Sequence, residues 1–201
     1  MNKVCLVTGS AKGIGASIIR ELAKSGIDCV INYLHSEKEA YLLEDEIKKY
    51  GVNTLVIKAD ESNEEEVNKM FLKIEEKFNG IDILVNNASV QYQADKLEDI
   101  SNEQFDYTLK VNLYGMFYLT KEVLPYLKDG SSIINISSIT TYKGEPQLID
   151  YVTTKGGIIG FTRSLARNLA TRNIRVNAIA PGFFWTPLQP NCWVEDKIPT
   201  L

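Results

Sequence analysis

Tyr151 and Lys155 are the residues whose types and spacing point most directly to chemistry. They lie four positions apart in Tyr-Val-Thr-Thr-Lys, so on a helix their side chains share one face. A free tyrosine has a pKa of about 10, but a neighbouring cation stabilises the phenolate and lowers that value. With Lys155 beside it, Tyr151 is expected to pass a proton to or from an alcohol oxygen. The pair alone is common by chance, so the assignment depends on its surroundings.

Ser138 supplies the first of those surroundings. It follows the apolar run Ile133–Ile136, which we expect to be a buried strand. Ligands of open α/β sheets bind at the carboxyl edge of the strands, where Ser138 would lie. Its hydroxyl could then hydrogen-bond a substrate oxygen while Tyr151 protonates it.

Short apolar runs alternate with longer amphipathic segments along the whole chain. The runs are rich in Val and Ile and do not alternate with polar residues, as expected for strands buried on both faces. They are Val4–Val7, Cys29–Ile31, Thr54–Ile57, Ile83–Val85, Ile133–Ile136 and Ile174–Ile179. Alternating strands and helices predict a Rossmann-like, doubly wound parallel sheet in a three-layer αβα arrangement. We find no interdomain linker, so residues 1–201 are expected to form one domain that carries the active site.

Helix starts are predicted from three capping boxes, Ser36…Glu39, Ser62…Glu65 and Ser101…Gln104. The two longest helices are expected at Asn102–Tyr126 and Asp150–Arg172.

The segment Thr8–Gly15 predicts a phosphate loop, because it follows the first strand and opens the first helix. Glycines let the backbone approach a pyrophosphate, and the helix N-terminus directs free N–H groups at the anion. The spacing is GxxxGxG, and the candidate binding residues are Gly9, Ser10, Lys12, Gly13, Ile14 and Gly15.

The end of the second strand favours NADP(H) over NAD(H). NAD-binding units place a carboxylate there for the ribose 2′-hydroxyl, whereas this chain reads Asn32-Tyr33-Leu34-His35-Ser36. Lys12 offers a cation for a 2′-phosphate instead, although it could equally be a solvated loop lysine. NAD(H) therefore stays possible.

Taken together, these residues resemble the short-chain dehydrogenase/reductases over essentially the whole chain. Besides the glycine loop, Ser138, Tyr151 and Lys155, the resemblance rests on Asn86-Asn87-Ala88-Ser89, on Asn112 in Lys110-Val111-Asn112, on Asp60, and on Pro181-Gly182 with Thr186. Members that act as 3-oxoacyl-carrier-protein reductases and glucose dehydrogenases look most similar.

The resemblance implies hydride transfer between a nicotinamide and a carbonyl or secondary alcohol, with a catalytic tetrad of Asn112, Ser138, Tyr151 and Lys155. Tyr151 would be the acid or base, Lys155 would lower its pKa and bind the ribose, Ser138 would polarise the carbonyl, and Asn112 would position a water. The implied cofactor contacts further include Asn32, Asp60, Asn87, Ala88, Pro181, Gly182 and Thr186.

Composition excludes several other classes. Hydrophobic residues make up 44% and charged residues 24%, with a net charge of −4, so no basic face for nucleic acid or anionic lipid is expected. Cys5, Cys29 and Cys192 have no metal-site or disulfide spacing. We therefore expect a cytoplasmic protein with a small-molecule substrate, no bound metal and no membrane partner.

Two departures from the family pattern leave alternatives open. Ser89 replaces a usual glycine, and the chain stops at Leu201, before the family's last helix and strand. The resemblance implies a homodimer or homotetramer, which this short end would weaken, along with stability. A cofactor-binding scaffold with little turnover is the main alternative, and a sugar-nucleotide epimerase or dehydratase is less favoured. Tyr142, Phe184, Trp185 and Trp193 could line a substrate wall or simply pack.

Overall fold

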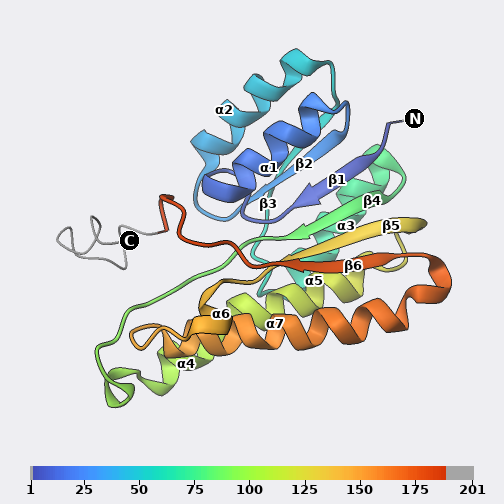
Figure 1. Cartoon of the computed structure of the whole chain (residues 1–201). Helices are drawn as coiled ribbons and strands as arrows, with labels where there is room; N and C mark the ends of the chain where they lie inside the picture. The colour runs from blue at the N-terminus through green and yellow to red at the C-terminus, as the bar shows by residue number, and fades with distance from the viewer. Residues whose placement is uncertain (1, 189–201) are drawn as a thin grey trace.

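The computed structural model describes residues 2–188 and contains a six-stranded parallel sheet between layers of helices (Figure 1). The strand order is β3-β2-β1-β4-β5-β6, and every neighbouring pair is parallel. The strands are β1 Val4–Val7, β2 Asp28–Tyr33, β3 Thr54–Lys58, β4 Ile81–Asn86, β5 Leu127–Ile136 and β6 Arg175–Ile179. All six predicted strands and the doubly wound arrangement are confirmed.

The helices fall into two sets, one on each face of the sheet (Figure 1). One face carries α1 Gly13–Lys24 and α2 Glu37–Ile47; the other carries α3 Glu64–Phe78, α5 Met116–Val123 and α7 Ile149–Asn168. The remaining helical segments are α4 Asn102–Leu109, η3 Lys110–Gly115, α6 Thr140–Lys143 and the short turns η1 Lys48–Tyr50, η2 Leu97–Asp99 and η4 Ala170–Arg172.

Alternate residues of each central strand supply two separate apolar cores. Leu6 and Val30 pack with α3 and α5, whereas Cys5, Val7 and Ile31 pack with α1 and α2. Because both faces are buried, the strands need apolar side chains at every position, and this explains their unbroken runs of Val, Ile and Leu. Cys5 and Cys29 face each other across β1 and β2 as buried free thiols, with their sulfur atoms 3.6 Å apart.

The two long helices occur close to where they are predicted. The first runs through α4, η3 and α5 from Asn102 to Val123, and η3 is a π-helical turn within it. The second, α7, ends at Asn168 and is followed by η4. A π-helical turn widens a helix locally and is frequent at functional sites; here it contains Asn112.

Only one of the three predicted capping boxes has the expected hydrogen bond. Ser101 accepts from the backbone N–H of Gln104 at 3.1 Å. Ser36 occupies the N-cap of α2 but makes no side-chain cap bond. The prediction at Ser62 is wrong, since Asn63 caps α3 by accepting from the N–H groups of Glu65 and Glu66. Ser62 instead donates its hydroxyl to Asp60 at 2.7 Å.

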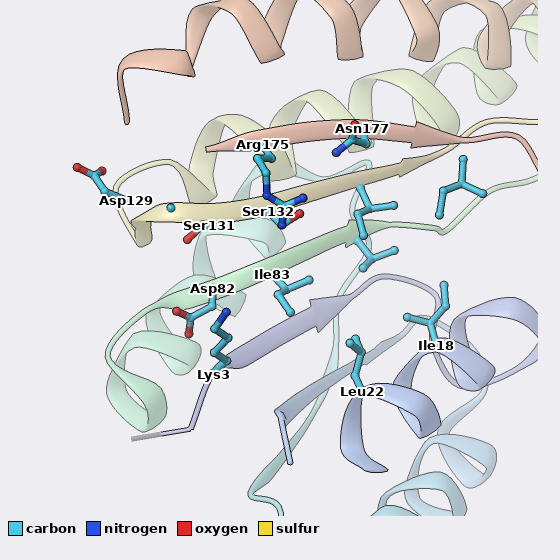
Figure 2. Close-up of a pocket in the computed structure, with 14 residues that line it drawn as sticks. Lys3, Ile18, Leu22, Asp82, Ile83, Asp129, Ser131, Ser132, Arg175 and Asn177 are labelled. Atoms are coloured by element: carbon cyan, nitrogen blue, oxygen red, sulfur yellow. The ribbon is translucent and has the colours of Figure 1, made fainter. Parts of the chain in front are cut away.

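An apolar groove of about 450 Å³ lies over the sheet beside α1 (Figure 2). Ile18 and Leu22 of α1 form one wall, and Ile83 and Ile134 form the floor. Within residues 2–188, no helix covers this face of β5 and β6. In the same part of the chain, no helix combines the length and apolar character that a membrane crossing requires.

Asn63→Ala tests the revised cap of α3. Loss of the side-chain acceptor is expected to lower the free energy of unfolding by about 1 kcal/mol, measured by urea denaturation. Ser36→Ala is the matched control at an N-cap without a side-chain bond, and it should change stability by less than half as much. Equal effects of the two variants would contradict the assignment.

Candidate active site

The loop after β1 turns back sharply at Gly9 and Gly13, which both have a φ of +57°. A β-carbon at Gly9 would lie 2.9 Å from the Cβ atom of Ala88, and one at Gly15 would lie 2.7 Å from Nδ2 of Asn87. Glycine is therefore required by backbone conformation at Gly9 and by close approach at Gly9 and Gly15. This packing brings the glycine loop directly against the segment that follows β4.

The N-terminus of α1 opens from this loop with its backbone donors free of side-chain caps. Lys12 occupies the N-cap without a side-chain cap bond, and the first turn contains no acidic residue. The first N–H groups of a helix lack internal partners and carry the positive end of its dipole. With a glycine cradle in front of it, this terminus fits the pyrophosphate of a dinucleotide cofactor.

Thr8 joins the ends of β1 and β4. Its hydroxyl oxygen accepts hydrogen bonds from the backbone N–H groups of Asn87 and Ala88, both at 3.0 Å. Asn87 returns a bond from Nδ2 to the carbonyl of Thr8 at 2.8 Å. These strands flank the topological switch point, where ligands of such sheets bind.

Asn32, in β2, holds the glycine loop by hydrogen bonds. Its Oδ1 accepts from the N–H of Gly9 at 3.1 Å, and its Nδ2 donates to the carbonyl of Ala59 at 3.1 Å. The side chain is buried, so its contacts in the structure position the glycine loop. Tyr33–Ser36, at and just after the end of β2, contains no carboxylate.

Lys12 and Asp60 already have protein partners. The Lys12 ammonium lies 3.6 Å from a carboxylate oxygen of Glu39, and both side chains are about half exposed. Oδ1 of Asp60 accepts from both the backbone N–H and the hydroxyl of Ser62. Lys12 is thus paired within the chain, a contact that sequence spacing does not predict.

Tyr151 and Lys155 share a face of α7, as predicted from their spacing. The Lys155 ammonium lies 5.3 Å from the centroid of the Tyr151 ring and donates to the carbonyl of Ile136 at 2.9 Å. Both residues are buried. Burial lowers the pKa of Lys155 to about 8, while the negative charge of Glu61 acts in the opposite direction. The cation thus sits next to the phenol ring, as the proposed tuning of Tyr151 requires.

Ser138 lies just beyond β5, near the strand end that holds Lys155. Its hydroxyl oxygen accepts from the N–H of Thr140 at 3.2 Å and from the hydroxyl of Thr140 at 2.8 Å. Because both bonds use the oxygen as acceptor, the hydrogen of Ser138 is free for donation to a further oxygen.

Asn112 connects three segments. Its Oδ1 accepts from the N–H of Val90 at 2.8 Å, and its Nδ2 donates to the carbonyl of Val90 and to the hydroxyl of Thr154. Thr154 in turn donates to the carbonyl of Tyr151 at 2.7 Å. The side chain of Asn112 therefore ties the loop after β4 to the helix that carries Tyr151.

Two buried carboxyl groups of the site, Asp150 and Glu61, are not predicted from the sequence. Asp150 accepts from Gln104 and Thr108 of α4 and from the backbone N–H of Tyr151, so it fixes the start of α7. An acidic residue in a first helical turn is a weak signal of such a role. Glu61 is buried beside Thr8, and no local pattern marks it.

The segment after β6 approaches the glycine loop. Pro181 accepts from the N–H of Ile139 at 2.9 Å, and Thr186 would lie 3.4 Å from a β-carbon at Gly13. Gly182 has no atom within 4 Å of its β-carbon position. Tyr142, Phe184 and Trp185 are more than half exposed, so they are not packed into the core. Trp193 and Cys192 lie outside the described residues.

Gly9→Ala tests the close approach of the loop. The added carbon would meet Ala88 at 2.9 Å in a strained conformation, at an expected cost of more than about 2 kcal/mol of unfolding free energy and at least a tenfold weaker NADPH affinity. Gly26→Ala is the control, since its φ of +76° is also positive but nothing lies within 4 Å. Equal losses of stability and affinity in both variants would contradict the steric argument.

The sequence is similar to a known protein family and to several characterised and uncharacterised proteins. A family model described as short chain dehydrogenase matches residues 3–196. General stress protein 39 of Bacillus subtilis is 44% identical over 196 residues, which cover 98% of this chain and 68% of that protein. Glucose and ribitol dehydrogenase of Daucus carota is 37% identical over 202 residues, covering 98% and 69% respectively.

A solved structure shows the same architecture. It is a short chain dehydrogenase from Burkholderia cenocepacia in complex with NADP, with a TM-score of 0.89 and 33% identity over 92% of this chain and 76% of that one. The family match, these relatives and the six-stranded parallel sheet together show that this chain belongs to the short chain dehydrogenase family.

Proposed function

We propose that this chain is an oxidoreductase that uses NADP(H) in preference to NAD(H) to interconvert a carbonyl group and a secondary alcohol, within one domain. The observation that carries the proposal is the burial of Tyr151 next to the Lys155 ammonium, 5.3 Å from ring centroid to nitrogen, at the sheet edge that also carries the glycine loop and Ser138. When bound, the nicotinamide cofactor supplies or accepts the hydride.

Tyr151 moves the proton. In reduction, its hydroxyl donates to the substrate oxygen as negative charge develops there, and the resulting phenolate is stabilised by the Lys155 ammonium. Ser138 donates its free hydrogen to the same oxygen and helps to polarise the carbonyl. In oxidation the transfers run in reverse, with the phenolate of Tyr151 as the base.

Lys155 has to stay charged for this tuning. Burial lowers its pKa to about 8, so the ammonium form still predominates at neutral pH. Its bond to Ile136 uses one of its three N–H donors, and the others are suited to the ribose hydroxyls of the cofactor. Asn112 acts by holding α7 in place through Thr154.

The preference for NADP(H) rests on Lys12 and on the lack of a carboxylate at Tyr33–Ser36. The solved relative from Burkholderia cenocepacia holds NADP, which supports the same choice. Glu39 lies beside Lys12 and would repel a 2′-phosphate, so we expect the preference to be modest.

The substrate class is a small carbonyl or alcohol compound. One relative is named for glucose and ribitol, so polyols and sugars head a panel that also contains simple alcohols and 3-oxoacyl thioesters. A cofactor-binding scaffold with little turnover is the second candidate. It predicts NADPH binding without turnover on any of these compounds.

We also infer self-association. Large aromatic side chains are exposed along α4, η3 and α5, namely Phe105, Tyr107, Tyr114 and Phe117, and exposed apolar clusters of this kind mark interaction surfaces. A homodimer or homotetramer would cover them.

The free, closely spaced thiols of Cys5 and Cys29 fit a reducing compartment such as the cytoplasm.

Tyr151→Phe tests the acid–base role. The ring packing is retained but the transferable proton is lost, so turnover should fall by about 10²- to 10⁴-fold while NADPH affinity stays within about threefold, as measured by steady-state kinetics and fluorescence titration. Tyr126→Phe is the control, because Tyr126 stacks on Phe71 in the core and its variant should keep full turnover. A Tyr151→Phe variant with unchanged kcat would exclude the mechanism.

Cofactor preference is tested by two opposite substitutions. Lys12→Ala should weaken NADPH binding by about three- to tenfold and leave NADH binding unchanged, because only the 2′-phosphate loses a partner. Glu39→Gln should tighten NADPH binding, because it frees Lys12 and removes a like charge. Dissociation constants for both cofactors decide the matter, and an unchanged NADPH constant in both variants would show that Lys12 is a solvated loop residue.

A further inference from the structure

Asp150 is a buried carboxyl group that no step of the proposed mechanism uses, and it directly precedes Tyr151 in the chain. Only 1% of its surface is exposed. Its Oδ2 accepts from Nε2 of Gln104 at 3.0 Å and from the hydroxyl of Thr108 at 2.8 Å. Its Oδ1 accepts from the backbone N–H of Tyr151 at 2.8 Å. One carboxylate thus joins α4 to the first turn of α7.

These three donors make the burial of Asp150 possible. An isolated buried carboxylate is strongly unfavourable, and within residues 2–188 no lysine, arginine or histidine forms an ion pair with Asp150. The N–H of Tyr151 lies in the first turn of α7, where backbone donors have no acceptor within the helix and the helix dipole favours an anion. Loss of the bonds to α4 would therefore release the start of α7.

A second contact repeats this arrangement one turn further along both helices. Asn112 lies four residues after Thr108, and Thr154 lies four residues after Asp150. Nδ2 of Asn112 donates to the hydroxyl of Thr154 at 3.1 Å. Residues four apart share a helix face, so Asp150 and Thr154 form one polar face of α7. This face is directed at the helical segment that begins with α4, which lies beside α7 (Figure 1).

The active face of α7 adjoins this polar face. Tyr151 follows Asp150 by one residue and Lys155 follows Thr154 by one residue, which is a rotation of about 100° around an α-helix. The contacts of Asp150 and Thr154 therefore set the direction in which the active face points. Side-chain tips lie about 5–6 Å from a helix axis, so a rotation of about 10° moves them by about 1 Å. A displacement of this size can reduce a reaction rate by about 10²-fold.

We propose that Asp150 is a positioning residue of the active site, whose hydrogen bonds to Gln104 and Thr108 set the rotation of α7 and thereby the place of the Tyr151 hydroxyl. The inference rests on the proposed function, in which Tyr151 moves the proton. Asp150 acts through the helix backbone and does not itself transfer that proton. Asp150→Asn would keep the same contacts, because Gln104 can turn its own amide and present its oxygen. The site thus requires the hydrogen-bond geometry of this residue and not its negative charge.

Steady-state kinetics of two substitutions at Asp150 test the proposal on the best substrate of the panel. Asp150→Ala removes all three hydrogen bonds, and kcat should fall by about 10- to 100-fold. KM and the NADPH dissociation constant should stay within about threefold of the wild type, because the phosphate loop is unchanged. Asp150→Asn should keep kcat within about threefold. An unchanged kcat in Asp150→Ala, or an equal loss in both variants, would overturn the proposal.

Thr108→Val is the milder variant if Asp150→Ala does not fold. The Thr108 hydroxyl hydrogen is shared between Asp150 and the carbonyl of Gln104 at 2.9 Å, so kcat should fall by only about three- to tenfold, and Thr108→Ser should restore it. Thr153→Val is the matched control, because Thr153 is an exposed residue of α7 that donates to the carbonyl of Ile149. Rates are measured where circular dichroism shows each variant fully folded. Equal kcat in Thr108→Val and Thr153→Val would overturn the proposal, because α4 would not be the anchor.

Hydrogen exchange at the backbone N–H of Tyr151 tests the positioning without substrate or cofactor. In protein labelled with ¹⁵N-tyrosine, the NMR signal of Tyr151 is the one missing from Tyr151→Phe. Thr108→Val leaves the Asp150 acceptor in place, yet exchange at Tyr151 should rise by about two- to fivefold relative to that of Tyr33 in β2, which reports global opening. Thr153→Val should not change this ratio.

An unchanged ratio in Thr108→Val would overturn the proposal. Faster exchange in Thr108→Val, together with no turnover by the wild type on any compound of the panel, would instead retain the positioning by Asp150 and reject the proposed catalytic function. The two inferences therefore fail in different experiments.

Discussion

The hydroxyl of Thr8 accepts from the backbone N–H groups of both Asn87 and Ala88, and this pair of bonds joins the ends of β1 and β4 where the winding of the sheet reverses. The close approach of Gly9 to Ala88 depends on the same junction. A larger distance between the ends of β1 and β4 would separate the glycine loop from the segment after β4. The candidate phosphate site at the N-terminus of α1 would then lose its shape. The requirement for glycine and for a small side chain at Ala88 therefore follows from one contact.

A second set of polar contacts fixes α7 against the sheet. Nδ2 of Asn86 donates to Asn135 of β5 at 2.8 Å, and Nδ2 of Asn135 donates to Thr162 of α7 at 2.9 Å. Buried amides pair only in specific geometries, so this chain of bonds limits the sliding of α7 along the apolar face beneath it. Together with the bond from Asn112 to Thr154, it sets where Tyr151 and Lys155 lie relative to the strand ends.

The strands, the glycine loop and the Tyr151–Lys155 pair are predictable from sequence because each depends on spacing within a short segment. The cap of α3 is not, since Ser62 and Asn63 are both good caps and Asp60 captures the Ser62 hydroxyl. The pairing of Lys12 with Glu39 and the burial of Glu61 depend on segments brought together only by the fold. Helix and strand propensity and hydrophobic periodicity do not predict contacts between distant segments. A glutamate that follows a strand has the same local sequence pattern whether its side chain is exposed or buried.

Burial has opposite consequences for the two halves of the proposed proton-transfer machinery. Exclusion of water strengthens the electrostatic effect of an ammonium on a neighbouring phenol. The same exclusion of water lowers the pKa of Lys155 and favours its neutral amine, which would not stabilise a phenolate. An anion inside the site offsets the second effect, but one too close to Tyr151 would also oppose its ionisation. Glu61 approaches from the end of β3, beside Thr8 and Gly115, whereas Lys155 and Tyr151 share α7. The Glu61 carboxylate raises the pKa of the Lys155 ammonium and so offsets part of the effect of burial.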